Sequence, residues 1–165
     1  MRFGFWFVFG FLASSFSAVG QYSNSWITPG QSYYRIPVAQ KGIYRLTHTD
    51  LQNAGVPVNV IDPRQIQIFH RGVEQAILVA GQDDAVFNSS DYIEFFGRAN
   101  DGTLDKDLYK PSSLQPHNYY NLYSDTTAYF LTWPIAVTPG KRVTSFSEVN
   151  VGGLPAQTYH TSERL

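Results

Sequence analysis

Stretches in which apolar and polar residues alternate recur along the chain, and this period of two predicts strands rather than helices. Tyr33 to Val38 alternates in this way, and Pro37 indicates an edge strand or the end of a strand. After a turn at Lys41-Gly42, Ile43 to Leu46 alternates again. We expect these two segments to pair as a hairpin.

Further strands are predicted at regular intervals downstream. They are expected over residues 65–69, 73–80, 92–98, 119–123 and 129–133, with a weaker one over 143–146. Arg71-Gly72 indicates a tight reversal, and Asn100-Asp101-Gly102 is a strong signal for a hairpin turn. Many short strands separated by turns predict an all-β fold, a β-sandwich of mostly antiparallel strands.

The sequence THTDLQNAGVP gives the one helix signal. Thr49 is a candidate N-cap, Gln52 stands three residues later as in a capping box, Gly55 is placed for a C-cap, and Pro57 follows. We therefore expect one short connector helix between the strands.

The first twenty residues have the layout of a secretory signal peptide. Arg2 precedes an apolar run, and the small residues Ala18 and Gly20 stand before a plausible cleavage site at Gln21. The apolar run is shorter than the roughly 20 residues of a membrane-spanning helix, so an uncleaved anchor is the less favoured alternative. We expect a signal peptide over residues 1–20 and one β-module over 21–165, with no transmembrane span in the mature chain. Because QTYHTSERL resembles the start of another element, we expect the module to be truncated at its C-terminus.

Composition narrows the functional classes. The chain is 43% hydrophobic and 15% charged, with a formal net charge of −1, which argues against disorder and gives no basic surface for nucleic acid. It has no cysteine, so it holds no thiol nucleophile and no zinc–thiolate site. The absence of cysteine in an exported chain favours the periplasm or outer surface of a bacterium.

A polar loop ahead of the 92–98 strand, AGQDDAVFNSSD, partly matches a calcium-binding loop. Asp84, Asn88 and Asp91 would occupy positions 5, 9 and 12, but Ala and Gln stand at positions 1, 3 and 6, where oxygen ligands and a glycine are needed. A plain turn is the favoured interpretation, and a calcium site is the alternative. No other metal or cofactor is expected.

The remaining chemistry is sparse. The acidic residues lie mostly in turn segments, where Asp and Asn bond to the local backbone, and the four histidines share no ligand spacing. We therefore predict no catalytic residue. Trp26, Tyr119, Tyr120 and Trp133 could form an aromatic platform for a sugar, although aromatic residues on strands are more often part of the core.

Several segments, taken in order, resemble a known family. They are YYRIPVAQKGIYRLTHTDLQNAGV, IDPRQIQIFHRGVEQAI, FNSSDYIEFFGRANDGTLDKDLY, YSDTTAYFLTW and GKR. Together they resemble the N-terminal β-region of PorU-type proteins, which are gingipain-like cysteine peptidases. These peptidases act as the sortase of the type IX secretion system in certain Gram-negative bacteria. The resemblance covers roughly residues 25–165, and YIEFFGRANDGTLD is its most specific part.

The resemblance implies a non-catalytic role for this segment. In that family a caspase-like domain downstream carries a Cys/His dyad, removes the C-terminal sorting signals of secreted cargo and attaches the cargo at the cell surface. No catalytic residue can be transferred to a chain without cysteine. The expected partners are the downstream peptidase domain and the type IX translocon, at the periplasm or outer-membrane surface. The alternative is a free-standing module for carbohydrate binding or for calcium-stabilised adhesion.

Overall fold

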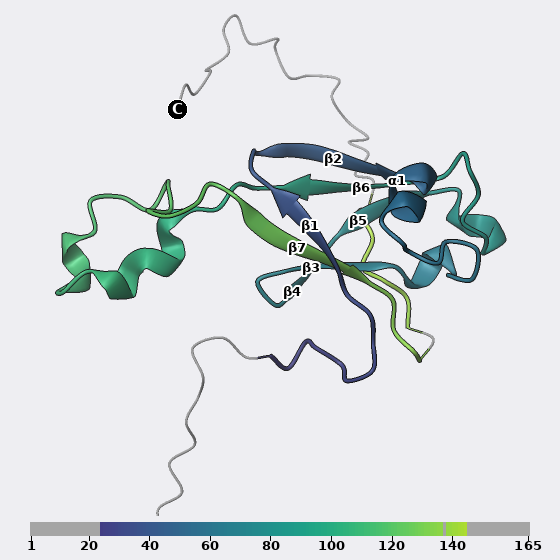
Figure 1. Cartoon of the computed structure of the whole chain (residues 1–165), viewed down its shortest axis with the longest axis horizontal. Coiled ribbons are helices and arrows are strands. Elements are labelled where there is room, and N and C mark those ends of the chain that lie inside the picture. The colour runs from purple at the N-terminus through teal and green to yellow at the C-terminus, as the bar shows by residue number, and fades with distance from the viewer. Residues whose placement is uncertain (1–23, 137, 145–165) are drawn as a thin grey trace, which may run out of the picture.

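The computed structural model describes residues 24–136 and 138–144. The predicted signal peptide and the last part of the chain, including Ser145 and Phe146 of the weak strand predicted at 143–146, lie outside these residues. Within them, two antiparallel sheets form an all-β, sandwich-like fold with short helices at its ends (Figure 1). No helix in the described part of the chain is both long and apolar enough to cross a membrane.

The first sheet contains four strands in the order β1-β7-β3-β4. β7 lies between its two long-range partners: Leu131 is opposite both Tyr34 of β1 and Ile68 of β3. The bounds are β1 (Tyr34–Val38), β3 (Gln67–His70), β4 (Val73–Gln75) and β7 (Thr127–Thr132).

The second sheet contains three strands in the order β2-β6-β5. Their bounds are β2 (Gly42–Thr47), β5 (Ile77–Ala80) and β6 (Tyr92–Gly97). Ile93 in the central strand is opposite Leu46 on one side and Val79 on the other. The alternation that predicted β6 therefore reflects real burial, since Ile93 and Phe95 are buried and Phe96 is exposed.

The core lies between the two sheets. Phe95 of β6 packs across the gap on Tyr129 of β7, with ring centroids 5.1 Å apart, and the Tyr129 hydroxyl accepts a hydrogen bond from the Arg98 backbone. Burying this apolar surface is the main favourable term for folding. The buried hydrophobic residues are Val38, Leu51, Val56, Val58, Ile61, Ile66, Ile68, Ile77, Val79, Phe87, Ile93, Phe95, Tyr129 and Leu131.

One predicted strand pairing and the extent of one predicted strand are wrong. β1 and β2 do not form a hairpin, because β1 pairs with β7 in the first sheet and β2 pairs with β6 in the second. The predicted strand over 73–80 is two strands, β4 and β5, which belong to different sheets and are separated by Ala76. In both places the chain passes from one sheet to the other. A local alternating pattern predicts a strand but does not indicate which sheet the strand joins. The reversal at Arg71-Gly72 is confirmed, with positive φ at both residues.

The connector helix exists, but it begins earlier than predicted. α1 covers His48–Asn53, its N-cap is Thr47, and Asp50 completes the capping box. Thr47 and Asp50 form the capping box two residues upstream of the predicted pair, Thr49 and Gln52. The negative charge of the Asp50 carboxylate is also favourable at a helix N-terminus. Three-residue 3-10 turns also occur at Pro63–Gln65 (η1), Gln82–Asp84 (η2) and Ser112–Leu114 (η4).

The segment GKR, residues 140–142, closes one edge of the second sheet. The Ile77 N–H donates to the Lys141 carbonyl, and the Val143 N–H donates to the Ile77 carbonyl. The Arg142 guanidinium donates to four main-chain carbonyls, those of Pro63, Arg64, Ile66 and Lys141, and to the Gln82 side chain. Gly140 has no room for a side chain, because a Cβ there would lie 2.0 Å from the Ile66 carbonyl oxygen.

Candidate functional site

A lobe formed by residues 102–125 projects from one end of the sandwich, between β6 and β7 (Figure 1). The sequence predicts a hairpin at Asn100-Asp101-Gly102 and a strand over Tyr119–Tyr123, and both predictions are wrong. None of the residues 100–102 has positive φ. Asp101 instead caps a 3-10 helix, η3 (Gly102–Leu108), by accepting a hydrogen bond from the Thr103 N–H.

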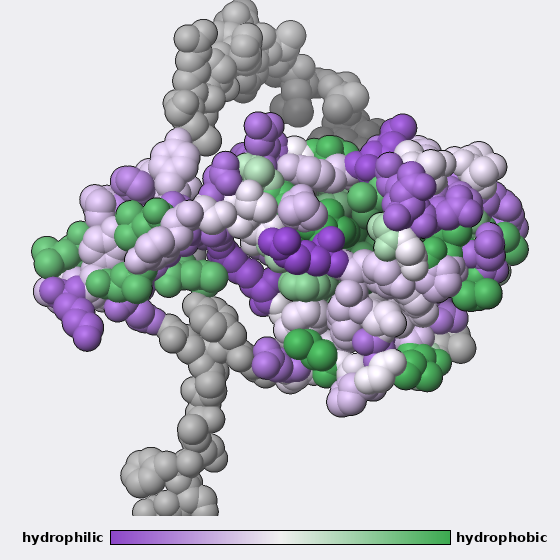
Figure 2. All heavy atoms as spheres, in the orientation of Figure 1, coloured by the Kyte–Doolittle hydropathy of each residue, from purple (hydrophilic) through white to green (hydrophobic). Residues whose placement is uncertain are grey.

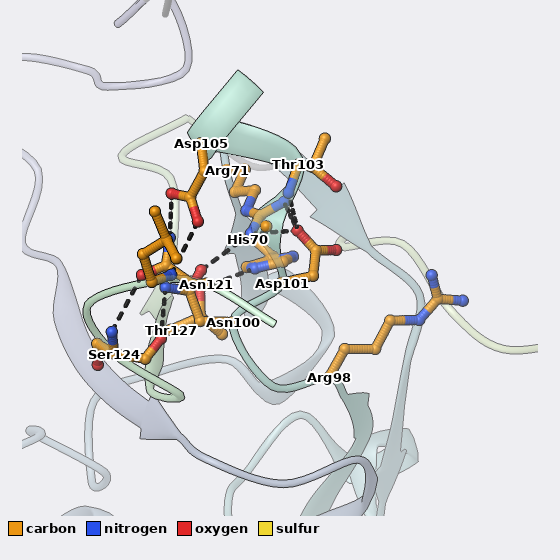
Figure 3. A network of polar contacts seen from close by, with 12 residues as sticks. His70, Arg71, Arg98, Asn100, Asp101, Thr103, Asp105, Asn121, Ser124 and Thr127 are labelled. Carbon is orange, nitrogen blue, oxygen red and sulfur yellow. Dashed lines mark hydrogen bonds and ion pairs between the residues drawn. The ribbon is translucent and has the colours of Figure 1, made fainter. Parts of the chain in front are cut away.

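The lobe is held together around one buried carboxylate. Asp105 is 4% exposed and accepts hydrogen bonds from the Asn121 side chain (2.5 Å) and the Leu122 N–H (2.9 Å). Asn121 in turn accepts from the N–H groups of Tyr123 and Ser124 (Figure 3). A charged acceptor shared by two donors is among the stronger kinds of hydrogen bond, so this cluster replaces the apolar core that so short a segment lacks.

Gly102 holds the start of the lobe against residues 115–120. Its N–H donates to the Asn118 carbonyl (2.9 Å) and its own carbonyl accepts from the Gln115 side chain (2.7 Å). A Cβ at this position would lie 2.6 Å from the Tyr120 carbonyl oxygen, so the close approach requires glycine.

Arg71 joins the lobe to the sandwich. It stands in the β3–β4 turn, and its guanidinium donates to the side chains of Asn100 and Asp101 at 3.0 Å (Figure 3). Burial opposes ionisation of Asp101, but hydrogen bonds from Thr103 and Arg71 outweigh it and lower the pKa of this carboxyl. Asn100 also binds the far end of the lobe, at Ser124 and Asp125.

His70 lies beside this junction. Its ring stacks on Tyr129 with centroids 4.2 Å apart, and its Nε2 is 3.1 Å from the Thr127 hydroxyl. Burial and the positive charge of Arg71 lower the pKa of His70 below its ordinary value of 6.5, although Asp101 acts in the opposite direction. Because Thr127 is buried, this imidazole–hydroxyl pair is a structural contact and offers no exposed nucleophile.

We expect the free energy of unfolding to fall as the pH is lowered through and below 6.5. The folded state favours neutral His70, so the unfolded chain binds more protons between the two pKa values. Chemical denaturation of wild type and His70→Phe at several pH values measures the effect, because phenylalanine keeps the ring stacking and does not titrate. The variant should lose less stability on acidification, and an identical loss in both proteins would contradict the assignment.

The lobe carries most of its apolar side chains on its outside. Figure 2 shows hydrophobic atoms gathered on it, and the residues concerned are between 39% and 81% exposed. Single exposed hydrophobic residues are normal, but a group of them on one projection indicates a surface for contact with another protein. The group comprises Leu104, Leu108, Leu114, Tyr119, Tyr120, Leu122 and Tyr123. Sequence analysis missed this surface because it assigned residues 119–123 to a strand.

The four residues of the predicted aromatic platform lie in three separate environments. Trp26 covers the outer face of the first sheet, where its ring contacts Phe69 and Phe130 at centroid distances of 5.3 and 5.5 Å. Trp133 stacks on Tyr34 beside the core. Tyr119 and Tyr120 are on the lobe, next to the His117 ring.

The predicted calcium-loop residues do come together, and they bind to one another. Asp84 accepts hydrogen bonds from the Val86 N–H and the Asn88 side chain. Asp91 is buried and accepts from the Asn88 N–H (2.7 Å) and the Ser90 hydroxyl (3.4 Å). Elsewhere in the described ranges as well, no three His, Asp or Glu side chains cluster as a possible metal site.

A calcium site in this loop would have a simple signature. Calcium that binds only the folded protein raises the melting temperature, and the rise grows with the logarithm of the free calcium concentration once this exceeds Kd. Thermal melts with calcium and with magnesium as the matched control would test it. A rise with calcium alone that disappears in Asp84→Ala supports the site, and superimposable melting curves rule it out.

Comparisons with protein-family models, with curated proteins and with solved structures found no match to this chain.

Proposed function

We propose that this chain is the non-catalytic N-terminal module of a gingipain-like cysteine peptidase, the sortase of a type IX secretion system. The observation that carries the proposal is the ordered series of sequence segments, of which YIEFFGRANDGTLD is the most specific. This segment forms β6, the junction residues Asn100 and Asp101, and the start of the lobe up to Asp105. An all-β body is what a β-region ahead of a peptidase domain requires.

In this proposal the module works by docking. The exposed leucines of the lobe are the surface that packs on the downstream caspase-like domain, and Asp105 and Arg71 keep that surface in a fixed orientation. Translocon components are the second expected partner. The module is exported, and it acts in the periplasm or at the outer surface, where the peptidase processes C-terminal sorting signals of cargo.

The first experiment tests identity. The reading frame is expected to continue past residue 165 into a domain with a Cys/His dyad, and the purified 21–165 segment is expected to hydrolyse no peptide substrate. A stop codon close to residue 165, or hydrolysis by the segment that survives rigorous purification, would refute the proposal.

The second experiment tests docking, with the module and the peptidase domain produced separately and their binding measured by calorimetry. The double variant Leu108→Ser, Leu122→Ser should weaken binding by about tenfold or more, since buried anchors dominate interface energies. Val60→Ser is the matched control, because Val60 is 80% exposed but lies on the sandwich. Equal binding by wild type and the double variant would exclude the lobe.

A free-standing carbohydrate-binding or calcium-stabilised adhesion module is the alternative. Exposed Tyr119 and Tyr120 favour the carbohydrate version. Binding on a glycan array that Tyr120→Ala abolishes, together with a reading frame lacking a peptidase domain, would support it over the sortase module.

A further inference from the structure

A cleft of about 770 Å³ separates the lobe from the sandwich. The second sheet and the chain leading to it contribute Lys41, Phe96 and Arg98, and the lobe contributes Tyr119, Tyr120 and Asp125. A concave site lined by a few polar groups and aromatic rings is the usual form of a small-ligand site. The cleft shares Tyr119 and Tyr120 with the exposed apolar group of the lobe but is lined by none of its leucines, and it does not depend on the proposed function.

Two cations in this cleft have no carboxylate partner. Within residues 24–136 and 138–144, the Arg98 guanidinium makes no hydrogen bond or ion pair, and its contact is with the Phe96 ring at 5.7 Å. Figure 3 shows its side chain extending away from the Arg71–Asp101 pair. Lys41 is exposed and likewise has no ion pair among these residues. By contrast Arg45, Arg64 and Arg71 each pair with an acid.

The charge in the cleft is positive. Lys41 and Arg98 contribute two positive charges, and Asp125 contributes one negative charge. Asp101 also lines the cleft, but it is already neutralised by Arg71. The balance of one positive charge favours an anion, and a guanidinium matches the geometry of a phosphate group in particular.

The two tyrosines define the rest of the ligand. Tyr119 and Tyr120 are 68% and 66% exposed, so most of each ring is accessible although both rings contact His117, and their phenol groups can donate hydrogen bonds. Exposed aromatic rings pack favourably on flat apolar groups.

We propose that this cleft binds a small phosphate monoester that carries a flat ring. Arg98 and Lys41 hold the phosphate group, and Tyr119 and Tyr120 contact the ring.

The test uses the mature protein and three probes: phenyl phosphate, inorganic phosphate and phenol. Titration followed by calorimetry or by amide NMR shifts should show saturable binding of phenyl phosphate, weaker binding of inorganic phosphate and none of phenol. Arg98→Gln and Lys41→Gln should each weaken the binding of phenyl phosphate by about tenfold or more, because hydrogen bonds to charged groups contribute about 1.5–3 kcal/mol. Tyr120→Ala should make the affinity for phenyl phosphate equal to that for inorganic phosphate, because the contact with the phenyl ring is lost.

Two matched variants separate a site from general charge attraction. Asp125→Asn removes the one unpaired negative charge and should tighten binding. Arg35→Gln removes an exposed arginine on β1, outside the cleft, and should leave binding unchanged. Non-saturating binding, or an equal loss in Arg35→Gln and Arg98→Gln, would overturn the proposal. Saturable binding that responds to Arg98 and Asp125 in opposite directions would establish it, whatever becomes of the sortase assignment.

Discussion

Replacing Tyr129 by alanine is expected to lower the free energy of unfolding by about 3–5 kcal/mol, the usual cost of removing a buried aromatic ring from a core. Tyr129 is 1% exposed and contacts Phe95 of the opposite sheet as well as His70 of its own. Its loss opens a cavity at the point where the two sheets meet. Chemical denaturation followed by circular dichroism measures the change.

Tyr129→Phe is the matched control for this prediction. It keeps the ring and removes only the hydroxyl that accepts a hydrogen bond from the Arg98 N–H at 3.1 Å. Leaving one donor without a partner costs about 1–3 kcal/mol when it is buried. The alanine variant should therefore be clearly less stable than the phenylalanine variant. Two variants of equal stability would show that the ring does not bridge the sheets.

Replacing Asp105 by alanine is expected to loosen the lobe while leaving the sandwich folded. The change leaves the Asn121 side chain and the Leu122 N–H without their acceptor, at a cost of about 1–3 kcal/mol. Hydrogen exchange should accelerate by about tenfold or more for amides of residues 102–125, since local opening sets their protection. Amides of Ile68 in β3 and Ile93 in β6, which are interior strands of the two sheets, should change little.

Asp83→Ala is the control for this second prediction, because Asp83 is an exposed carboxylate outside the lobe. It should leave exchange in the lobe unchanged. Faster exchange throughout the molecule in Asp105→Ala would mean that the lobe and the sandwich unfold as one unit, which contradicts the separate polar cluster described for the lobe.

The positions of the strands could be predicted from the sequence, whereas their partners could not. β1, β2, β3, β6 and β7 lie within one or two residues of the alternating segments, because one face of each is buried or partly buried against the core. Pairing in a sandwich depends on which layer each strand joins. β1 and β2 are adjacent in sequence and yet belong to different sheets, so proximity along the chain was a misleading guide.

The lobe shows a second limit of the sequence signal. Asn-Asp-Gly favours a hairpin when positive φ is needed, but the same residues also favour helix capping and close backbone contact. Here Asp101 caps η3, and Gly102 fits beneath the Tyr120 carbonyl. The choice is made by contacts with Arg71, Gln115 and Asn118, which are distant from this segment in sequence.

The candidate site was therefore only partly predictable. The sequence names the two lobe tyrosines as members of a possible aromatic platform, but it groups them with Trp26 and Trp133, which pack on the sandwich. Lys41 and Arg98 had no distinguishing pattern in the sequence. Their shared cleft exists only because the chain from residue 102 to 125 folds back beside the second sheet.

The proposed docking role is tested most directly by hydrogen exchange on the complete protein encoded by the longer reading frame that the proposal predicts, compared with the isolated 21–165 segment. The account predicts that amides around Leu104, Leu108 and Leu122 are more protected in the complete protein, while those around exposed Arg35 exchange equally in both. Identical exchange across residues 102–125 would contradict it, because the apolar surface of the lobe would then be uncovered where it is proposed to be buried.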